Sequence, residues 1–230
     1  MIFIKAHQDF DFNRLNIPEE QYDEFTILSR NELHNDYPVN ILYETEKNNK
    51  LNKWNKIYGD LTYQYYVYEN INKFDDIIGM MQYRRVFNNI TMRHYKEIMK
   101  ENDALLFGYN MSSTLVENYE WAHKNDLLMK SIDLIYTYKP EYRSIDYYNT
   151  TLLFAHNMFI MHKEDYVEYS KFMFWVCDML QEKYNVLSLN DDPEYYRMLS
   201  LLGERLSTIF FLKHFLETKK KVYWDRLITL

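Results

Sequence analysis

The chain has 230 residues, of which 47% are hydrophobic and 27% are charged, so it has enough apolar material for one domain spanning residues 1–230. Its formal net charge of -7 and isoelectric point near 5.5 argue against a nucleic-acid partner, because nucleic-acid-binding surfaces are usually basic. The single cysteine, Cys177, excludes an internal disulfide framework and fits a reducing compartment.

The start of the chain and its hydropathy predict a cytoplasmic protein. Met1 to Ala6 has neither the basic region nor the long apolar region of a secretory signal. No apolar run reaches the ~18 residues that a membrane-spanning helix needs. We therefore expect any membrane contact to be peripheral, at the inner membrane.

Apolar patterns predict strands that alternate with helices along the chain. Short apolar runs between polar residues predict strands at 2–6, 25–29, 77–81, 103–108, within 152–161 and at 221–228. Apolar residues that recur every three or four positions predict helices at 58–71, 93–101, 113–138, 163–184 and 193–219. The Asn- and Lys-rich segment 44–56 is expected to be a solvated, mobile loop. This alternation predicts an α/β fold with a largely parallel central sheet, flanking helices and a helical C-terminal part.

Several well-known site motifs are missing from the sequence. Its four glycines are far apart, so it encodes no glycine-rich phosphate loop of the dinucleotide-binding or P-loop type. It has no C-x-x-C or H-E-x-x-H metal motif and no G-x-S-x-G nucleophile elbow. Dinucleotide oxidoreductases, P-loop enzymes, zinc proteins and serine hydrolases are therefore disfavoured.

Polar side chains gather where predicted strands end, which is where open α/β sheets bind ligands. The stretch after Met81 contains Gln82, Tyr83, Arg84 and Arg85. Planar, permanently charged guanidinium groups suit a diphosphate, so the arginine pair is a candidate phosphate site. The alternative is an ordinary ion pair with Asp75, Asp76 or another acid. The other polar residues at strand ends or junctions are His7, which follows Ala6, and His156 with Asn157.

Two further polar sets lie on predicted helices. In "GERLS", Glu204 and Arg205 stand among apolar residues, where burial can raise the pKa of a carboxyl group and suit it to general base catalysis. The alternative is a structural Glu204–arginine bridge. His123 and Asp126 form the second set, and a structural role for His123 is the alternative there.

Four segments, in this order, resemble a bacterial family known as domain of unknown function 4422, whose members are regarded as glycosyltransferases of capsule, exopolysaccharide and O-antigen synthesis. The segments contain "YGDLTYQYYVYENINKFDDIIGMMQYRRVF", "YEWAHKNDLLMKSIDLIYTYKPEY", "HNMFIMHKEDYVEYSKFMFWVCDML" and "LLGERLSTIF". The chain departs from the family pattern at three positions. Asp60 stands where Glu is usual, Gln82 where His is usual and His156 where Tyr is usual. The neutral amide of Gln82 puts an acid–base role at that position in doubt.

The resemblance implies a GT-A-like fold that binds a nucleotide-diphosphate sugar over the first half of the sheet. It implies a UDP-linked donor, with galactose or galactofuranose as candidate sugars. Ala6 and His7 would border the nucleoside, and Tyr83, Arg84 and Arg85 would bind the diphosphate. Glu204 or Asp126 would deprotonate the acceptor hydroxyl. The sugar- and acceptor-binding candidates are Asp60, Gln82, His123, His156, Asn157 and Arg205.

Metal use and the partners are the remaining expectations. Many GT-A enzymes hold Mn²⁺ or Mg²⁺ with a D-x-D motif, but the only similar spelling at a strand end, "DFD" (Asp9 to Asp11), reads as a loop. The arginine pair could replace such a metal. The acceptor would be a saccharide or a lipid-linked saccharide, and lysines in the tail 213–230 could contact anionic lipid or simply cap a helix. The alternative function is a catalytically degenerate subunit that binds a nucleotide sugar or saccharide.

Overall fold

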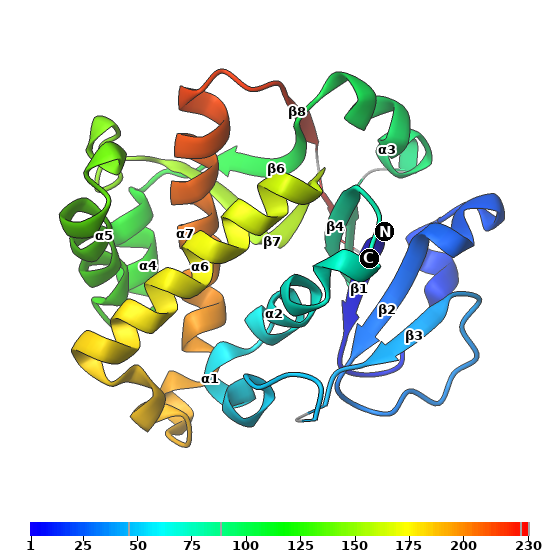
Figure 1. Ribbon diagram of the computed structural model, residues 1–230, viewed down its shortest axis with the longest axis horizontal. Helices are drawn as coiled ribbons and strands as arrows, with labels where there is room; N and C mark the ends of the chain where they lie inside the picture. Colours follow the sequence, from blue (N-terminus) through cyan, green and yellow to red (C-terminus); the bar gives the residue numbers. More distant parts are fainter. Residues whose placement is uncertain (46, 88, 226, 230) are drawn as a thin grey trace.

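Figure 1 shows the computed structural model, in which helices pack on both faces of a mixed β-sheet. The structure describes residues 1–45, 47–87, 89–225 and 227–229. Seven strands follow the order β3-β2-β1-β4-β7-β6-β8, and β5 pairs with β4 and β9 beside this path. The strands are β1 (Ile2–Ala6), β2 (Phe25–Ser29), β3 (Asn40–Tyr43), β4 (Ile77–Gln82), β5 (Arg85–Phe87), β6 (Ala104–Asn110), β7 (Leu152–His162), β8 (Val222–Asp225) and β9 (Leu227–Thr229).

The first half of the sheet is parallel, and its strand order reverses next to β1. Strands β1, β2 and β3 follow one another toward one edge, whereas β4 pairs with the other side of β1. A reversal of this kind leaves a crevice at the carboxyl ends of the two strands, where open α/β sheets bind ligands. Beyond β4 the sheet becomes mixed, because β7 is antiparallel to both β4 and β6, and β8 is parallel to β6.

The α-helices are α1 (Asn55–Tyr58), α2 (Leu61–Glu69), α3 (Asn89–Glu101), α4 (Leu115–His123), α5 (Leu127–Tyr138), α6 (Lys163–Tyr184) and α7 (Met198–Phe211). A π-helix, η8 (Leu212–Glu217), continues α7. Short 3₁₀ helices lie at Phe12–Leu15, Glu19–Glu24, Asn52–Trp54, Ile71–Lys73, Pro140–Ser144, Val186–Leu189 and Pro193–Tyr195. None of the helices in the described ranges is long and apolar enough to cross a bilayer.

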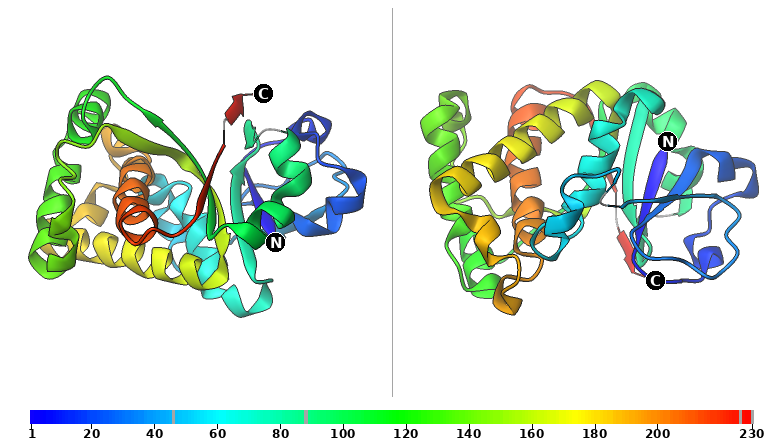
Figure 2. Two further views of the ribbon diagram at one scale, coloured as in Figure 1. Left: turned by 90° about the horizontal axis from the view of Figure 1, so that it is seen from above. Right: turned by 60° about the horizontal axis from the view of Figure 1, so that its bottom comes forward.

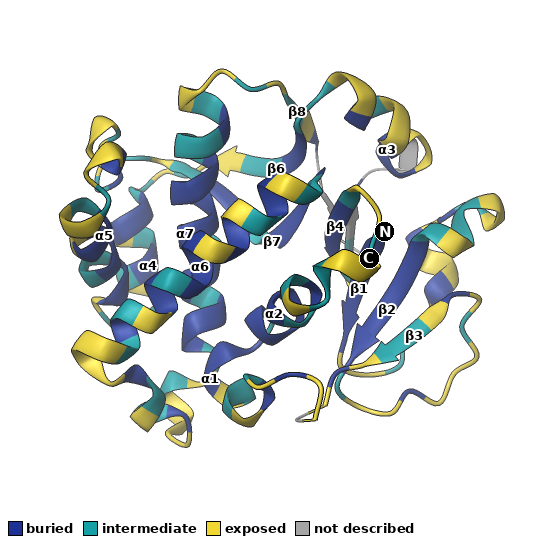
Figure 3. Ribbon diagram, in the orientation of Figure 1, coloured by how far each residue is buried: buried dark blue, intermediate teal, exposed yellow. Residues whose placement is uncertain are grey.

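Successive side chains of the strands point to opposite faces of the sheet and pack into two hydrophobic layers. On β1, Phe3 joins the larger layer under α2, α4, α5, α6 and α7, while Ile2 and Ile4 join the layer under α3. Figure 3 shows β1, β2 and the inner sides of the helices as buried, β3 as intermediate to exposed, and exposed residues on the outer sides of α5 and α6. The apolar runs predicted as central strands are therefore covered on both faces.

Two predicted helices differ clearly from the structure, and one strand of the structure was not predicted. The helix expected at 113–138 is broken, because Lys124 has a left-handed φ of 52° between α4 and α5. The helix expected at 193–219 starts only at Met198, after a 3₁₀ turn, and ends as a π-helix. Strand β3 is not among the predicted strands, although it contains the apolar residues Ile41, Leu42 and Tyr43; it is a short and largely accessible strand at the edge of the sheet.

The segment 44–56 is only in part the solvated loop that its composition predicts. Glu44, Asn49 and Asn52 are buried, and the amide of Asn52 donates to the backbone carbonyl of Glu44. Residue 46 lies outside the described residues. The exposed residues of the segment are Thr45, Lys47, Asn48, Lys50, Lys53 and Lys56. Composition therefore predicts the exposed positions but not the three polar side chains that are used inside the protein.

The C-terminal segment returns to the sheet (Figure 2). Strand β8 pairs with β6, and β9 pairs antiparallel with β5, opposite residues 85–87. This confirms the closing strand expected at 221–228, except at residue 226, which the structure does not describe.

Candidate active site

A cavity of about 360 Å³ opens at the carboxyl ends of β1 and β4, where the strand order reverses. Six of the residues singled out from the sequence line its sheet side: His7, Asp60, Gln82, Tyr83, Arg84 and Arg85. Four others approach from β7 and the helices: His123, His156, Glu204 and Arg205. The fold thus brings ten of the thirteen candidates together from segments almost 200 residues apart.

The other three candidates do not line the cavity. Ala6 is buried beside it at the end of β1, and its carbonyl accepts a hydrogen bond from Tyr63. Asn157 is buried and bonded to the backbone of α7 through Ser200. Asp126 is exposed before α5 and forms an ion pair of 2.7 Å with Lys130. This position gives Asp126 no access to a ligand in the cavity.

The cavity carries an excess of positive charge in a chain that is acidic overall. The cationic side chains among its described lining residues are Lys5, Arg84, Arg85, Arg197 and Arg205. The lining carboxylates are only Asp60 and Glu204. A wall with more cations than carboxylates raises the local concentration of anionic ligands and suits a diphosphate group.

Asp60 is the centre of a charged network at the floor of the cavity. Its carboxylate accepts a hydrogen bond of 3.1 Å from Arg197 and one of 3.3 Å from the Gln82 amide. Lys5 Nζ lies 3.9 Å from the same carboxylate. The sequence holds Asp60 there because Gly59 turns the chain with a φ of 51°, and a Cβ at Gly59 would lie only 2.9 Å from the Cβ of Ser200.

Gln82 links this network to the arginine pair. Its side-chain oxygen accepts a hydrogen bond of 2.8 Å from Arg85, while its amide nitrogen donates to Asp60 and to the carbonyl of His156. The Gln82 oxygen therefore faces the cation of Arg85, and the Gln82 nitrogen faces the Asp60 carboxylate and the His156 carbonyl. A neutral amide keeps these roles at any pH.

Arg84 and Arg85 are not paired with the two acids before β4. Asp75 lies 3.5 Å from the N-terminal amine, and Asp76 lies 3.9 Å from Lys163. Within the part of the chain that the structure describes, neither arginine forms a salt bridge. The ion-pair alternative is therefore wrong for these acids. Arg84 instead lies over the ring of Tyr83, at 4.9 Å from its centroid.

Tyr83 also holds His7 at the entrance of the cavity. The Tyr83 hydroxyl lies 3.1 Å from His7 Nε2, and the two rings meet edge to face. Burial lowers the pKa of His7, and the Arg84 charge lowers it further. At neutral pH the imidazole is therefore neutral, and it can exchange a hydrogen bond with Tyr83 in either direction.

Strand β7 is interrupted where it passes the cavity. His156 and Asn157 both have left-handed φ angles, 67° and 51°, and the pairing with β6 shifts in register between Leu106 and Gly108. The bulge turns His156 into the cavity and presents two carbonyls to side chains that line it. The carbonyl of His156 accepts from Gln82, and that of Asn157 accepts from Lys5 at 3.0 Å. Such bulges often re-aim a side chain beside a site.

Glu204 and Arg205 lie on α7 at the far wall of the cavity. Arg205 is 6% exposed and donates to Glu204 at 3.2 Å and to the Asn118 side chain at 2.7 Å. Burial raises the pKa of Glu204, although the Arg205 charge opposes the shift. The bridge offered as the structural alternative is thus present, yet the carboxylate still lines the cavity.

The two histidines on this wall are neutral at working pH. Burial, with Arg205 nearby, lowers the pKa of His123 to about 4. Burial and the charges of Arg85 and Lys5 lower the pKa of His156 to about 4. Their rings pack on Tyr119 and Phe107, which leaves them suited to hydrogen bonding with neutral hydroxyl groups and unsuited to carrying charge.

A family model described as "Domain of unknown function (DUF4422)" matches residues 1–215 of the chain. The chain belongs to this family. The matched residues include nearly the whole sheet and all the residues that line the cavity. Among curated proteins, nothing matches.

One solved glycosyltransferase structure shares the fold of this DUF4422 chain, and two others resemble it more weakly. WbbM, a bifunctional glycosyltransferase in its apo form, has a TM-score of 0.73 and 20% identity over 100% of this chain and 45% of its own. The chain thus spans less than half the length of WbbM. Core-mannan synthase A from Aspergillus fumigatus, in a Mn/GDP form, gives 0.46 at 9% identity over 100% and 74% of the two chains. The mannosyltransferase Ktr4p from S. cerevisiae gives 0.40 at 9% over 99% and 70%. The likeness to WbbM confirms the α/β, GT-A-like fold.

The carboxylates that the structure describes in this DUF4422 chain do not form a divalent metal site. Across residues 1–45, 47–87, 89–225 and 227–229, no group of three or more His, Cys, Asp or Glu side chains is placed to hold a metal ion. In "DFD", Asp9 accepts from the backbone of His34 and Asn35, and Asp11 caps a 3₁₀ helix. In the cavity, Asp60 and Glu204 are each already paired with cations.

Sequence reasoning missed two cations of the cavity, Lys5 and Arg197. A lysine inside the apolar strand "IFIKA" was the available signal for Lys5, because a buried lysine needs a polar partner. Arg197 has a left-handed φ of 59° just before α7, and no local pattern reveals that it points to Asp60. Only the fold joins these two residues.

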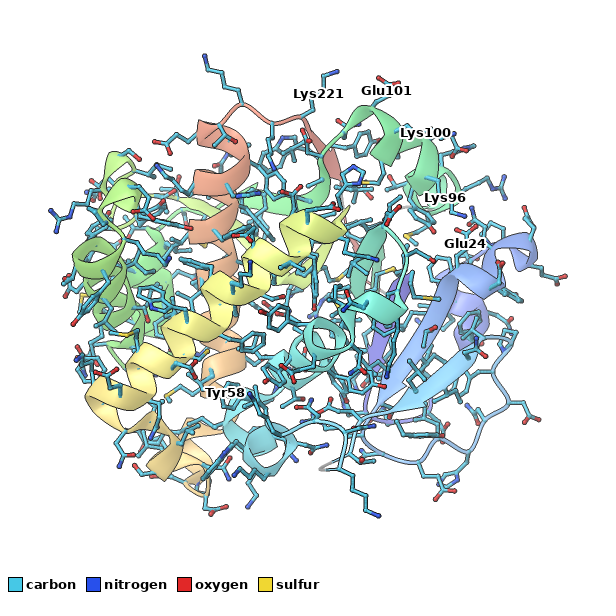
Figure 4. The ribbon with its side chains drawn as sticks, viewed as in Figure 1. Glu24, Tyr58, Lys96, Lys100, Glu101 and Lys221 are labelled. Atoms are coloured by element: carbon cyan, nitrogen blue, oxygen red, sulfur yellow. The ribbon has the colours of Figure 1, made fainter. Side chains whose placement is uncertain are left out.

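A second hollow, of about 610 Å³, lies at the opposite edge of the sheet. It is lined by the start of β4 at Asp76, by α3 with Lys96 and Lys100, and by Lys221. Figure 4 shows Lys96, Lys100 and Lys221 along this edge, whereas Tyr58, next to Gly59, lies at the other end of the molecule. The tail lysine Lys221 therefore lies away from the cavity.

Proposed function

We propose that this chain is a glycosyltransferase that moves a sugar from a nucleotide-diphosphate sugar to a saccharide acceptor in surface polysaccharide synthesis. The observation that carries the proposal is the cationic cavity at the strand-order reversal of a glycosyltransferase-like fold. Departure of a nucleoside diphosphate develops negative charge, and fixed cations around it supply the stabilisation that such a reaction needs.

In this proposal the donor lies over the first half of the sheet. Arg84 and Arg85 bind the diphosphate, with Tyr83 holding Arg84 in place. The nucleoside lies beside Ala6 and His7, where a side hollow of about 260 Å³ shares His7 and Asp60 with the main cavity. A UDP-linked galactose or galactofuranose is the donor that we propose to test first.

The acceptor approaches from α4, β7 and α7. His123, His156 and Arg205 present hydrogen-bonding groups suited to sugar hydroxyls, and in the described structure His123 Nε2 and Arg205 Nε are buried without a hydrogen-bond partner. Glu204 is the general base that deprotonates the attacking hydroxyl, a role that fits an inverting reaction. Its raised pKa keeps it basic enough to accept that proton.

A lipid-linked acceptor remains a separate proposal. The tail lysine Lys221 lies at the opposite edge of the sheet from the cavity, so a bilayer bound there would not present a lipid headgroup to Glu204. Flotation with anionic vesicles, comparing the intact chain with a variant that has Lys219 and Lys221 changed to Gln, tests membrane contact by itself.

The test of the proposed function is a panel of nucleotide sugars, read first by thermal shift and then by turnover. A ligand present at 100 times its dissociation constant stabilises the folded state by ~2.7 kcal/mol, which is easily measured. Slow hydrolysis of the bound donor, or its transfer to a saccharide, supports the enzyme. Donor binding without hydrolysis or transfer to any saccharide supports the degenerate subunit instead.

A further inference from the structure

We infer that Lys5, Arg85 and Arg197, held in place by Asp60 and Gln82, bind the donor diphosphate without a divalent metal ion. The inference rests on the proposed function, and it adds two cations that lie outside the arginine pair. It assigns Asp60 a positioning role, in place of a sugar- or metal-binding role.

The first reason is the state of the cavity carboxylates. A divalent cation needs carboxylate oxygens that no competing cation occupies. Asp60 Oδ1 accepts from Arg197 at 3.1 Å, and Asp60 Oδ2 faces Gln82 at 3.3 Å and Lys5 at 3.9 Å. A metal ion at Asp60 would have to displace these groups and would meet two positive charges at close range.

The second reason is the balance of charge. Lys5 and Arg197 lie beside Asp60, and Arg85 joins them through Gln82. When all four groups are ionised, they carry two net positive charges, which is the charge of one Mg²⁺ or Mn²⁺ ion. The three groups are fixed from separate directions. Lys5 comes from β1, Arg85 from the first position of β5 and Arg197 from the residue before α7. Such a preorganised set needs no reorganisation when the diphosphate leaves.

The third reason is that these cations have more N–H donors than the described hydrogen bonds use. The ammonium of Lys5 has three N–H donors but makes one hydrogen bond within ordinary distance, to the carbonyl of Asn157. Its side chain is 2% exposed and yet lines the cavity, so the remaining donors have little access to bulk water. Among the described residues, Arg85 and Arg197 each make one side-chain hydrogen bond to the network, and a guanidinium group has further N–H donors that could face a ligand.

The experiment measures binding of inorganic pyrophosphate, UDP and UDP-galactose by calorimetry, once with EDTA and once with Mn²⁺. We expect equal affinity in both buffers for the wild-type chain. Arg197→Gln, at a partly exposed side chain, should weaken binding about 10- to 100-fold in EDTA, as loss of a charge-assisted hydrogen bond does. Arg143→Gln changes the net charge equally at an exposed site outside the cavity and should bind like wild type.

Lys5→Met is the second variant, and it removes the buried cation with little change in side-chain volume. It should also weaken pyrophosphate binding at least about tenfold, with the fold checked by circular dichroism. If Lys5→Met does not fold, the affinity of Arg197→Gln for pyrophosphate still tests the inference.

The outcomes separate this inference from the proposed function. Binding that appears only with Mn²⁺ would overturn metal-free binding of the diphosphate by Lys5, Arg85 and Arg197. It would leave the transferase proposal standing. Unchanged affinity in Arg197→Gln and Lys5→Met would also overturn it. Metal-free binding without transfer of any sugar would support diphosphate binding by these three cations and would count against the transferase proposal. No binding of any of the three probes would overturn both.

Discussion

Arg197 donates a 3.1 Å hydrogen bond to Asp60 across 137 positions of the sequence, and so joins the start of α7 to the start of α2. The same carboxylate meets the end of β4 through Gln82. One side chain therefore links the start of α2 to two other elements that line the cavity. Substitutions near Asp60 should act on ligand binding as well as on stability.

Glu204→Gln should lower the rate of sugar transfer ~10²- to 10⁴-fold while leaving donor affinity nearly unchanged, because the amide cannot accept the proton of the acceptor hydroxyl. Initial rates with saturating donor, together with donor affinity by calorimetry, measure this. Asp126→Asn is the matched control, since Asp126 is exposed and outside the cavity. Normal turnover by Glu204→Gln and loss in Asp126→Asn would reverse the two roles.

The transfer rate should rise with pH through a pKa above the usual range of a glutamate. Burial raises the pKa of Glu204, so its carboxyl group stays protonated, and inactive as a base, to higher pH than an exposed glutamate. A pH profile of kcat at saturating donor measures the acidic limb. The residual activity of Glu204→Gln should lack this limb. An acidic limb that survives unchanged in the variant would assign the titration to another group.

Gln82→His should make donor binding depend on pH, unlike the wild-type amide. A neutral imidazole can accept from Arg85 and donate to Asp60, but the protonated ring has no acceptor and repels Arg85. Affinity for UDP-galactose should therefore fall as the pH drops from 8 to 5.5, through the ordinary histidine pKa of ~6.5. Calorimetry on both proteins measures the difference. Equal pH dependence in the two would show that Gln82 does not control Arg85.

Glu44→Gln should stabilise the protein at pH 8 and have little effect near pH 4.5. Burial raises the pKa of Glu44 to about 7 in the folded protein, so between about 4.5 and 7 the folded state binds the extra proton. Stability from this group is therefore present at low pH and is lost as the pH rises toward 7. Removing the charge should recover about 1–3 kcal/mol at pH 8, a shift of several degrees in Tm. Glu182→Gln, at an exposed site, is the control.

Gly59→Ala should destabilise the fold and weaken ligand binding together. The new Cβ would meet Ser200 Cβ at 2.9 Å, and the residue would have to keep a φ of 51°. The cost should be roughly 1 kcal/mol or more, with a lower Tm. Because Asp60 follows directly, pyrophosphate affinity should fall as well. A variant with wild-type Tm and affinity would mean that the turn tolerates a side chain.

The sequence predicts those parts of the fold and site whose signals are local. The apolar run before Gln82 has polar residues at its end, and that pattern was enough to locate both β4 and the arginine pair. Strands β1 and β2 were found at their full lengths for the same reason. The family resemblance then brought Glu204 and Arg205 into the same site.

The rest depends on contacts between distant segments. The helix break at Lys124, between α4 and α5, has no glycine or proline beside it that would predict a break from the sequence. The burial of Glu44 depends on Thr62, and the role of Arg197 depends on Asp60. Asp126 looked like part of a polar set with His123, but the same break turns it outward to Lys130. Periodicity describes each segment by itself and contains no information about such pairs.

The bulge in β7 has a consequence for synthesis of the chain. Lys5 emerges from the ribosome with the first strand, but the carbonyl that accepts its hydrogen bond belongs to Asn157, and Arg197 and Glu204 come later still. A nascent chain that ends before α7 therefore has the first half of the sheet but not the charge pattern of the cavity. Pyrophosphate binding by ribosome-bound chains of increasing length would accordingly report completion of the whole architecture, well after the parallel strands can pair.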